Sequence, residues 1–191
     1  VQVWRPRELN THETEWGFSC MSYEISGALG IKMANPNKEV ISFVGDGSYL
    51  LNNTDIYSSV ITKNKLIIIV CDNGGFAVIN RLQLFKGGNE YNNLLKSSNT
   101  PGLVDVDFAK HAESMGAKSE HVNSISDLEE AFKRAKKSDV TYVISIKTHA
   151  YQWLEGSAFW DSPTLEIPTT DENKEALKLY KEGKSKQRQG V

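Results

Sequence analysis

The sequence has few cysteines, no long apolar run and no excess of charge of one sign. Cys20 and Cys71 lack CxxC spacing and come without a secretory signal, which argues against a disulfide-stapled secreted domain and favours the cytoplasm. The apolar run at residues 66–71 is bounded by charged residues and is far shorter than the roughly 18 residues that span a bilayer, so we expect no membrane partner. With 22 basic and 24 acidic residues, the formal net charge of -2 gives no overall attraction for nucleic acid. A small molecule is therefore the expected ligand.

The length of the chain indicates one main domain. Its 191 residues, 39% of them hydrophobic, suffice for one compact core. The chain opens at Val1 without an initiator methionine, and we expect it to be a C-terminal segment of a longer enzyme. We place the main domain at residues 1–150, followed at 151–191 by an aromatic arm and a Lys-rich helical tail.

Apolar runs alternate with amphipathic segments along the main domain. Residues 40–44 and 66–71 are apolar runs rich in β-branched residues that do not alternate apolar with polar, as in strands that are covered on both faces. Helical spacing of apolar residues predicts helices over 21–34, with Ile25, Leu29 and Met33 on one face, and over 53–62. The sequence therefore predicts an α/β fold, a doubly wound and mostly parallel sheet with helices on both faces, whose ligands bind beyond the carboxyl ends of the strands.

The second half continues the alternation. Residues 107–115 read as a helix, and 140–146 as a strand. A helix over 126–137 opens with Ser-x-x-Glu, so Ser126 is expected to cap it and Glu129 to return the bond. Residues 87–101, rich in Gly, Asn and Ser, are either a loop that covers the site or a plain surface insertion. Residues 151–168 form the aromatic arm, and 172–189 a helical tail.

Two polar turns follow the two buried strands. Gly45-Asp46-Gly47-Ser48 comes directly after the first strand, and Asp72-Asn73 after the next, with 25 residues between Gly47 and Asn73. Glycines let a backbone approach an anion closely, and Gly45, Gly47 and Ser48 can offer N–H groups to phosphate oxygens. Mg2+ prefers few protein oxygens together with phosphate and water; Asp46, Asn73 and a carbonyl of the Gly74-Gly75 turn can supply them. Each turn alone is an ordinary tight turn.

Together, the two turns resemble the signature of thiamine diphosphate-dependent enzymes, Gly-Asp-Gly followed by Asn about 25 residues on. The likeness extends to residues 17–23, which precede a small-residue helix. It implies thiamine diphosphate and Mg2+ as cofactors, with the metal held by Asp46, Asn73 and Gly75. It further implies that Ser19 and Met21 meet the aminopyrimidine and that Leu51 supports the bent cofactor. Asp72 stands where many members have Asn, and Ser22 where many have Gly.

Within that family, further segments resemble the hydrolases that open trihydroxycyclohexane-1,2-dione in inositol breakdown. The matching stretches are residues 15–25, 45–50, 79–83 and 107–110, with more likeness around Trp160. The resemblance implies a cyclic diketone as substrate and a homo-oligomer, a dimer or a tetramer. The activating glutamate belongs to another domain of the enzyme, so it is expected outside this chain and the isolated chain should be inactive. His12 and Arg81 are candidates for substrate contact, although a purely structural role is favoured for His12 and a helix surface suits Arg81 equally well.

Two alternatives remain open at this point. One is a carboligase similar to acetolactate synthase, which shares the signature but not the intervening residues. The other is a phosphate- or nucleotide-binding module without catalysis, in which residues 45–48 cradle the anion.

Overall fold

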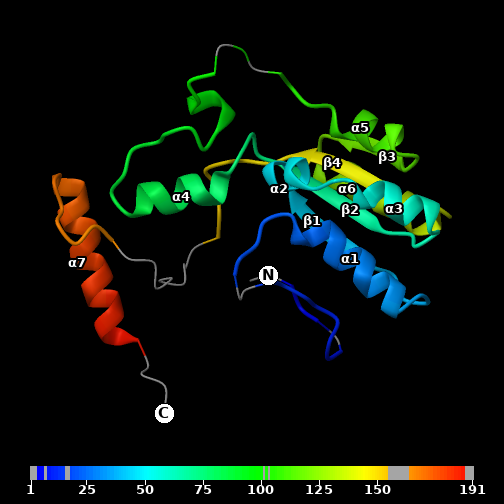
Figure 1. Ribbon diagram of the computed structural model, residues 1–191, viewed down its shortest axis with the longest axis horizontal. Helices are drawn as coiled ribbons and strands as arrows, with labels where there is room; N and C mark the ends of the chain where they lie inside the picture. Colours follow the sequence, from blue (N-terminus) through cyan, green and yellow to red (C-terminus); the bar gives the residue numbers. More distant parts are fainter. Residues whose placement is uncertain are drawn as a thin grey trace.

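One parallel sheet organises the molecule (Figure 1). The computed structural model describes residues 4–6, 8–15, 18–100, 102, 104–154 and 164–187. Four strands pair in the order β1-β2-β4-β3, and all three pairings are parallel. The strands are β1 (Ile41–Gly45), β2 (Ile67–Asp72), β3 (Lys118–Val122) and β4 (Tyr142–Lys147). With helices packed on both faces, the predicted α/β fold is confirmed.

Each face of the sheet carries its own core. On one face, α1 (Tyr23–Ala34), α3 (Asp55–Ile61) and α5 (Phe108–Ser114) pack against alternate residues of β1, β2 and β4. On the other face, α6 (Ile125–Lys137) inserts two fully buried alanines against the remaining strand residues. Both faces of β2 are therefore covered, which explains why its sequence is a continuous apolar run without alternation.

The remaining helices lie near the ends of the strands. The short helix α2 (Asp46–Leu51) begins directly after β1, and α4 (Ala77–Phe85) follows the turn after β2. A single 3-10 turn, η1 (Leu95–Ser97), interrupts the long loop predicted at 87–101. Figure 1 shows α4, this loop and α7 (Asp171–Lys186) on the side of the molecule where β1 and β2 end.

The helical tail is anchored at its first turn. The Asn173 side chain is buried and donates a hydrogen bond to the Gly87 carbonyl (2.7 Å). The Gly87 backbone lies so close to the first turn of α7 that an added Cβ would lie 2.6 Å from the Glu172 carbonyl oxygen. Of the aromatic arm, only residues 151–154 and 164–168 belong to the described part, so Phe159 and Trp160 lie outside it. No helix in the described residues is long and apolar enough to cross a membrane.

Three details differ from the sequence expectations. The helix expected at 126–137 begins at Ile125, because Ser124 rather than Ser126 caps it and accepts a hydrogen bond from Asp127 N–H (3.0 Å). Met33 does not join Ile25 and Leu29 in the core but is 61% exposed. The edge strand β3 was not predicted, because Lys-Ser-Glu-His carries no apolar signal.

Candidate functional site

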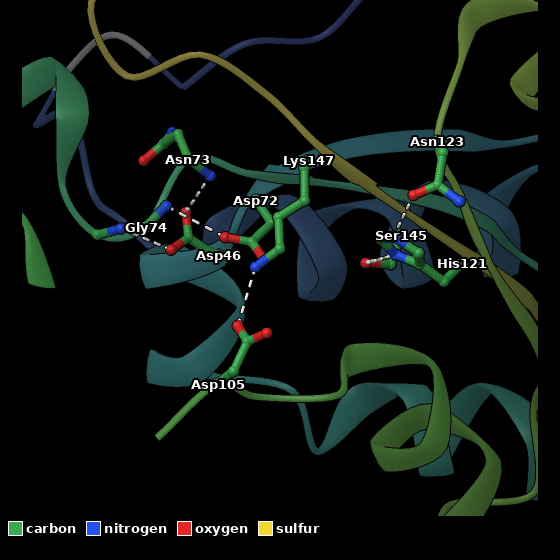
Figure 2. Close-up of polar contacts among 10 residues, drawn as sticks. Asp46, Asp72, Asn73, Gly74, Asp105, His121, Asn123, Ser145 and Lys147 are labelled. Atoms are coloured by element: carbon green, nitrogen blue, oxygen red, sulfur yellow. Dashed lines mark hydrogen bonds and ion pairs between the residues drawn. The ribbon is translucent and has the colours of Figure 1, made fainter. Parts of the chain in front are cut away.

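The two polar turns meet at one edge of the sheet. Gly45 pairs with Cys71 across β1 and β2, so both strands end at the same level. Asp46 is buried there, and its carboxylate accepts hydrogen bonds from two backbone N–H groups of the opposite turn. These bonds join Asn73 N to Oδ1 (3.2 Å) and Gly75 N to Oδ2 (2.7 Å) (Figure 2). The carboxylate thereby fixes the turn after β2.

The Asn73 side chain completes a small group of oxygens. One terminal atom of its amide lies 3.2 Å from Asp46 Oδ1 and 2.9 Å from the Gly75 carbonyl oxygen. With the nitrogen at this place, the amide donates to both oxygens. With the oxygen there, the amide oxygen lies 3.2 Å from Asp46 Oδ1 and 2.9 Å from the Gly75 carbonyl oxygen, close to the about 3 Å separation of neighbouring ligands in a Mg2+ octahedron. The three residues therefore fit a hard divalent cation.

Other cation chemistries have less support in the described residues. The described part of the chain contains no cluster of three or more His, Cys, Asp and Glu side chains that could hold a metal ion. One carboxylate, one amide and one carbonyl suit Mg2+, which takes its remaining ligands from phosphate and water.

Opposing effects act on the pKa of Asp46. Burial raises the pKa of its carboxyl group, and the neighbouring Asp72 carboxylate raises it further, while the hydrogen bonds from Asn73 and Gly75 oppose the shift. Burial also raises the pKa of the Cys71 thiol, with Asp46 adding to the effect. A positive charge at this edge would therefore be favourable.

A cation of the protein compensates the second carboxylate. Asp72 is also buried, and its Oδ2 lies 2.6 Å from the ammonium of Lys147 at the end of β4. The same ammonium lies 2.9 Å from Asp105 Oδ1, and these two carboxylates raise the pKa of Lys147. The other oxygen of Asp72 accepts a hydrogen bond from Gly74 N–H (3.1 Å).

The turn after β2 requires glycine, and its backbone is hydrogen-bonded to the long loop. Gly74 and Gly75 have φ of +78° and +139°, and a Cβ on Gly75 would lie 2.5 Å from the Asn93 carbonyl oxygen. Phe76 N–H donates to Asn93 O (2.7 Å) and Leu95 N–H to Gly74 O (2.9 Å). A hollow of about 370 Å3 beside the turn is lined by Gly75, Phe76 and seven residues between 92 and 100.

The first turn has an open side and a closed side. Among the described residues, adjacent ones apart, no heavy atom lies within 4 Å of the place where a Cβ on Gly45 would stand. At Gly47, in contrast, a Cβ would clash with the Phe76 ring, so this ring closes over α2. Ser48 is buried; its hydroxyl accepts from Ser22 N–H (2.6 Å) and donates to Glu24 (2.8 Å). The Ser48 side chain thus joins α2 to the start of α1.

The segment before α1 therefore reaches the same region. Ser19 is exposed with φ of 52°, and Met21 is partly exposed two residues further on. Leu51, at the end of α2, is 60% exposed. The apolar atoms of Met21 and Leu51 are available to a ligand or to another part of the protein. Glu24 belongs to α1, and its side chain accepts a hydrogen bond from the Ser48 hydroxyl. Gly17 lies outside the described residues.

Within the described part of the chain, the contacts of the two candidate substrate residues do not involve this edge. His12 Nε2 lies 3.2 Å from Thr14 Oγ1 in an exposed segment. Arg81 lies on α4, with its guanidinium 4.6 Å above the Trp153 ring. Arg81 therefore ties α4 to the start of the aromatic arm.

Comparison with protein families matches residues 1–146 to "Thiamine pyrophosphate enzyme, C-terminal TPP binding domain". The chain belongs to this family. The parallel sheet and the two polar turns at its edge are thus those of a TPP-binding domain, which supports thiamine diphosphate as the cofactor.

Three similar curated proteins share the name 3D-(3,5/4)-trihydroxycyclohexane-1,2-dione hydrolase. The protein from Shouchella clausii is 37% identical over 177 residues, which cover 92% of this chain and 28% of the relative. The one from Clostridium tetani is 38% identical over 165 residues, covering 83% of this chain and 26% of the relative. The one from Bacillus subtilis is 36% identical over 159 residues, covering 83% of this chain and 25% of the relative. The chain therefore spans about a quarter of the length of these relatives.

A solved structure shares the fold of this TPP-binding domain. A thiamine diphosphate-dependent 4-hydroxybenzoylformate decarboxylase from Rhodococcus jostii is 27% identical to the chain, with a TM-score of 0.56. The match covers 68% of this chain and 23% of the decarboxylase.

Proposed function

We propose that this chain is the cofactor domain of a Mg2+- and thiamine diphosphate-dependent hydrolase that opens trihydroxycyclohexane-1,2-dione in inositol degradation. The observation that carries the metal and diphosphate site is the convergence of the Asp46 carboxylate, the Asn73 side-chain amide and the Gly75 carbonyl at the carboxyl edge of the sheet. The name shared by the similar curated proteins supports the substrate.

Each residue of the edge has a defined task in this proposal. Asp46, Asn73 and the Gly75 carbonyl hold Mg2+, which offsets the diphosphate charge. The open side of Gly45 and the backbone of Gly47 and Ser48 receive the diphosphate.

The second group of residues receives the rest of the cofactor. Ser19 and Met21 line the aminopyrimidine side, and Leu51 supports the cofactor from below. Held by these residues, thiamine diphosphate would supply a nucleophilic carbon and an electron sink for C–C cleavage of the substrate. His12 and Arg81 remain candidates for contact with the cyclic diketone.

The rest of the enzyme is needed for turnover. We expect the activating glutamate on a domain outside this chain, and we expect a cytoplasmic homo-oligomer, a dimer or a tetramer. The apolar side chains exposed around the site support such an assembly, since Leu50 and Leu51 at the end of α2 are 50% and 60% exposed and Phe18 is 91% exposed.

The test uses the full-length protein that carries this chain. After removal of bound cofactor and metal, it is supplied with the trihydroxy dione, with and without thiamine diphosphate and Mg2+, and the products are identified by mass spectrometry. We expect the ring-opened acid only when both cofactors are present. A condensation product from two keto acids would instead indicate a carboligase. The absence of any cofactor-dependent product together with tight ATP binding would indicate a phosphate-binding module.

A further inference from the structure

A buried carboxylate and a half-exposed ammonium face each other beside the proposed metal site. Asp72 and Lys147 are register partners in the parallel strands β2 and β4, so their side chains leave the sheet on the same face. The distance from Lys147 Nζ to Asp72 Oδ2 is 2.6 Å. Figure 2 shows Lys147 standing between Asp72 and Asp105, with Asp46 on the far side of Asp72.

The burial of the two partners is unequal. The Asp72 side chain is 5% exposed, whereas the Lys147 side chain is 55% exposed. A buried carboxylate without a partner is strongly disfavoured, and a second carboxylate, Asp46, lies on the neighbouring strand end. The ammonium therefore keeps Asp72 in its buried position, and the pair adds no net charge to the edge.

The two oxygens of Asp72 do different things. Oδ2 accepts from Lys147, which leaves Oδ1 directed at Gly74 N–H (3.1 Å). This second bond closes the turn that presents Asn73 and Gly75 toward Asp46. The Lys147 ammonium bound to Oδ2 thus fixes the orientation of the Asp72 carboxylate. The other oxygen of that carboxylate, Oδ1, then holds the turn through Gly74 N–H.

We propose that Lys147 is a positioning residue for the Mg2+–diphosphate site, acting through Asp72 on the turn that carries Asn73 and Gly75. This inference rests on the function proposed above, because it needs Mg2+ to bind between Asp46 and that turn.

The chemistry of Asp72 makes the role testable by rescue. Asparagine at this position keeps an Oδ1 acceptor for Gly74 N–H but carries no charge, so it has no need of the ammonium. Loss of Lys147 should therefore be harmful beside Asp72 and nearly harmless beside Asn. A general loss of packing or solubility at Lys147 would not be repaired in this way.

The experiment measures Mg2+-dependent thiamine diphosphate affinity of the full-length protein by fluorescence or calorimetric titration. We expect Lys147→Met to weaken it at least tenfold, and Asp72→Asn to change it less than threefold. The double variant should bind within threefold of Asp72→Asn alone, and Lys147→Arg should bind like the unaltered protein. The matched control is Lys118→Met, because Lys118 is 57% exposed and makes a similar ion pair with Asp139 (2.8 Å).

The outcomes separate this inference from the proposed function. If Asp46→Ala removes the Mg2+ dependence but Lys147→Met binds normally, only the positioning role is overturned. The same holds if the double variant binds as poorly as Lys147→Met. If Asp46→Ala and Lys147→Met both leave Mg2+-dependent binding intact, the metal site itself is overturned. Should Lys147→Met fail to fold, the double variant still decides, since it must fold and bind.

Discussion

Replacing Asp46 with alanine probes the centre of the site. The carboxylate accepts two backbone hydrogen bonds, from Asn73 N–H at 3.2 Å and Gly75 N–H at 2.7 Å, and each bond to a charged acceptor contributes about 1.5–3 kcal/mol. The loss is partly offset, because Asp46→Ala also removes a buried charge that lies beside Asp72. We therefore expect a net destabilisation of about 1–3 kcal/mol and a fold that survives.

The effect on cofactor binding should be much larger than the effect on folding. Without the anionic oxygen, Mg2+ loses its charged ligand and the diphosphate charge is poorly offset. We expect thiamine diphosphate affinity in saturating Mg2+ to fall at least about 100-fold, or about 2.7 kcal/mol. Asn73→Ala should also lower thiamine diphosphate affinity, but by a smaller factor, because it removes a neutral oxygen.

The assay compares titrations of the full-length protein in Mg2+ and in a chelator. The unaltered protein should bind tightly only in Mg2+, whereas Asp46→Ala should bind weakly in both, with a far-UV circular dichroism spectrum that shows the fold intact. Asp139→Ala is the control, since the Asp139 side chain is 89% exposed. An Asp46→Ala variant with unchanged, still Mg2+-dependent affinity would refute the metal assignment.

Three further predictions concern activity, pH and helix capping. The isolated 191-residue chain should fold but should not open the dione ring, even with excess cofactor and Mg2+. Turnover by the isolated chain within about tenfold of the full-length enzyme, equal to about 1.4 kcal/mol in the activation barrier, would contradict a site split between domains. Arg134 lowers the pKa of Glu120 in the folded state, so this pair stabilises the fold above the unfolded pKa and the stabilisation is lost as pH falls through the folded pKa. Acid titrations of unfolding should therefore show a weaker pH dependence for Glu120→Gln, by up to about 1 kcal/mol, but not for the exposed control Glu129→Gln. Ser124→Ala should lower the free energy of unfolding by about 1 kcal/mol and Ser126→Ala by much less; the reverse order would restore the capping scheme expected from sequence.

The parts of the fold that follow from local patterns were predictable. Short, mainly apolar runs without alternation identified β1, β2 and β4, apolar spacing identified α1 and α3, and a capping pattern indicated α6. The meeting of Asp46 with Asn73 followed from one rule, that neighbouring parallel strands end at the same edge.

The parts that depend on strand order were not predictable. Lys147 follows a predicted strand, but its pairing with Asp72 exists only because β4 lies beside β2, and no local pattern encodes that order. The closure of Phe76 over Gly47 is likewise a long-range contact. The strand β3 escaped prediction because it lies at the sheet edge and carries mostly polar side chains, for which alternation is a weak signal.

The backbone shared by the metal turn and the long loop couples their stabilities. Gly74 O and Phe76 N–H bond to residues 95 and 93, so the loop cannot detach without releasing both ends of the turn that carries Gly75. A ligand that holds the Gly75 carbonyl therefore makes local opening of residues 93–95 less favourable, by the linkage between binding and the closed state. Amide hydrogen exchange in this loop is thus a reporter of occupancy at the turn, even though the loop itself need not touch the ligand.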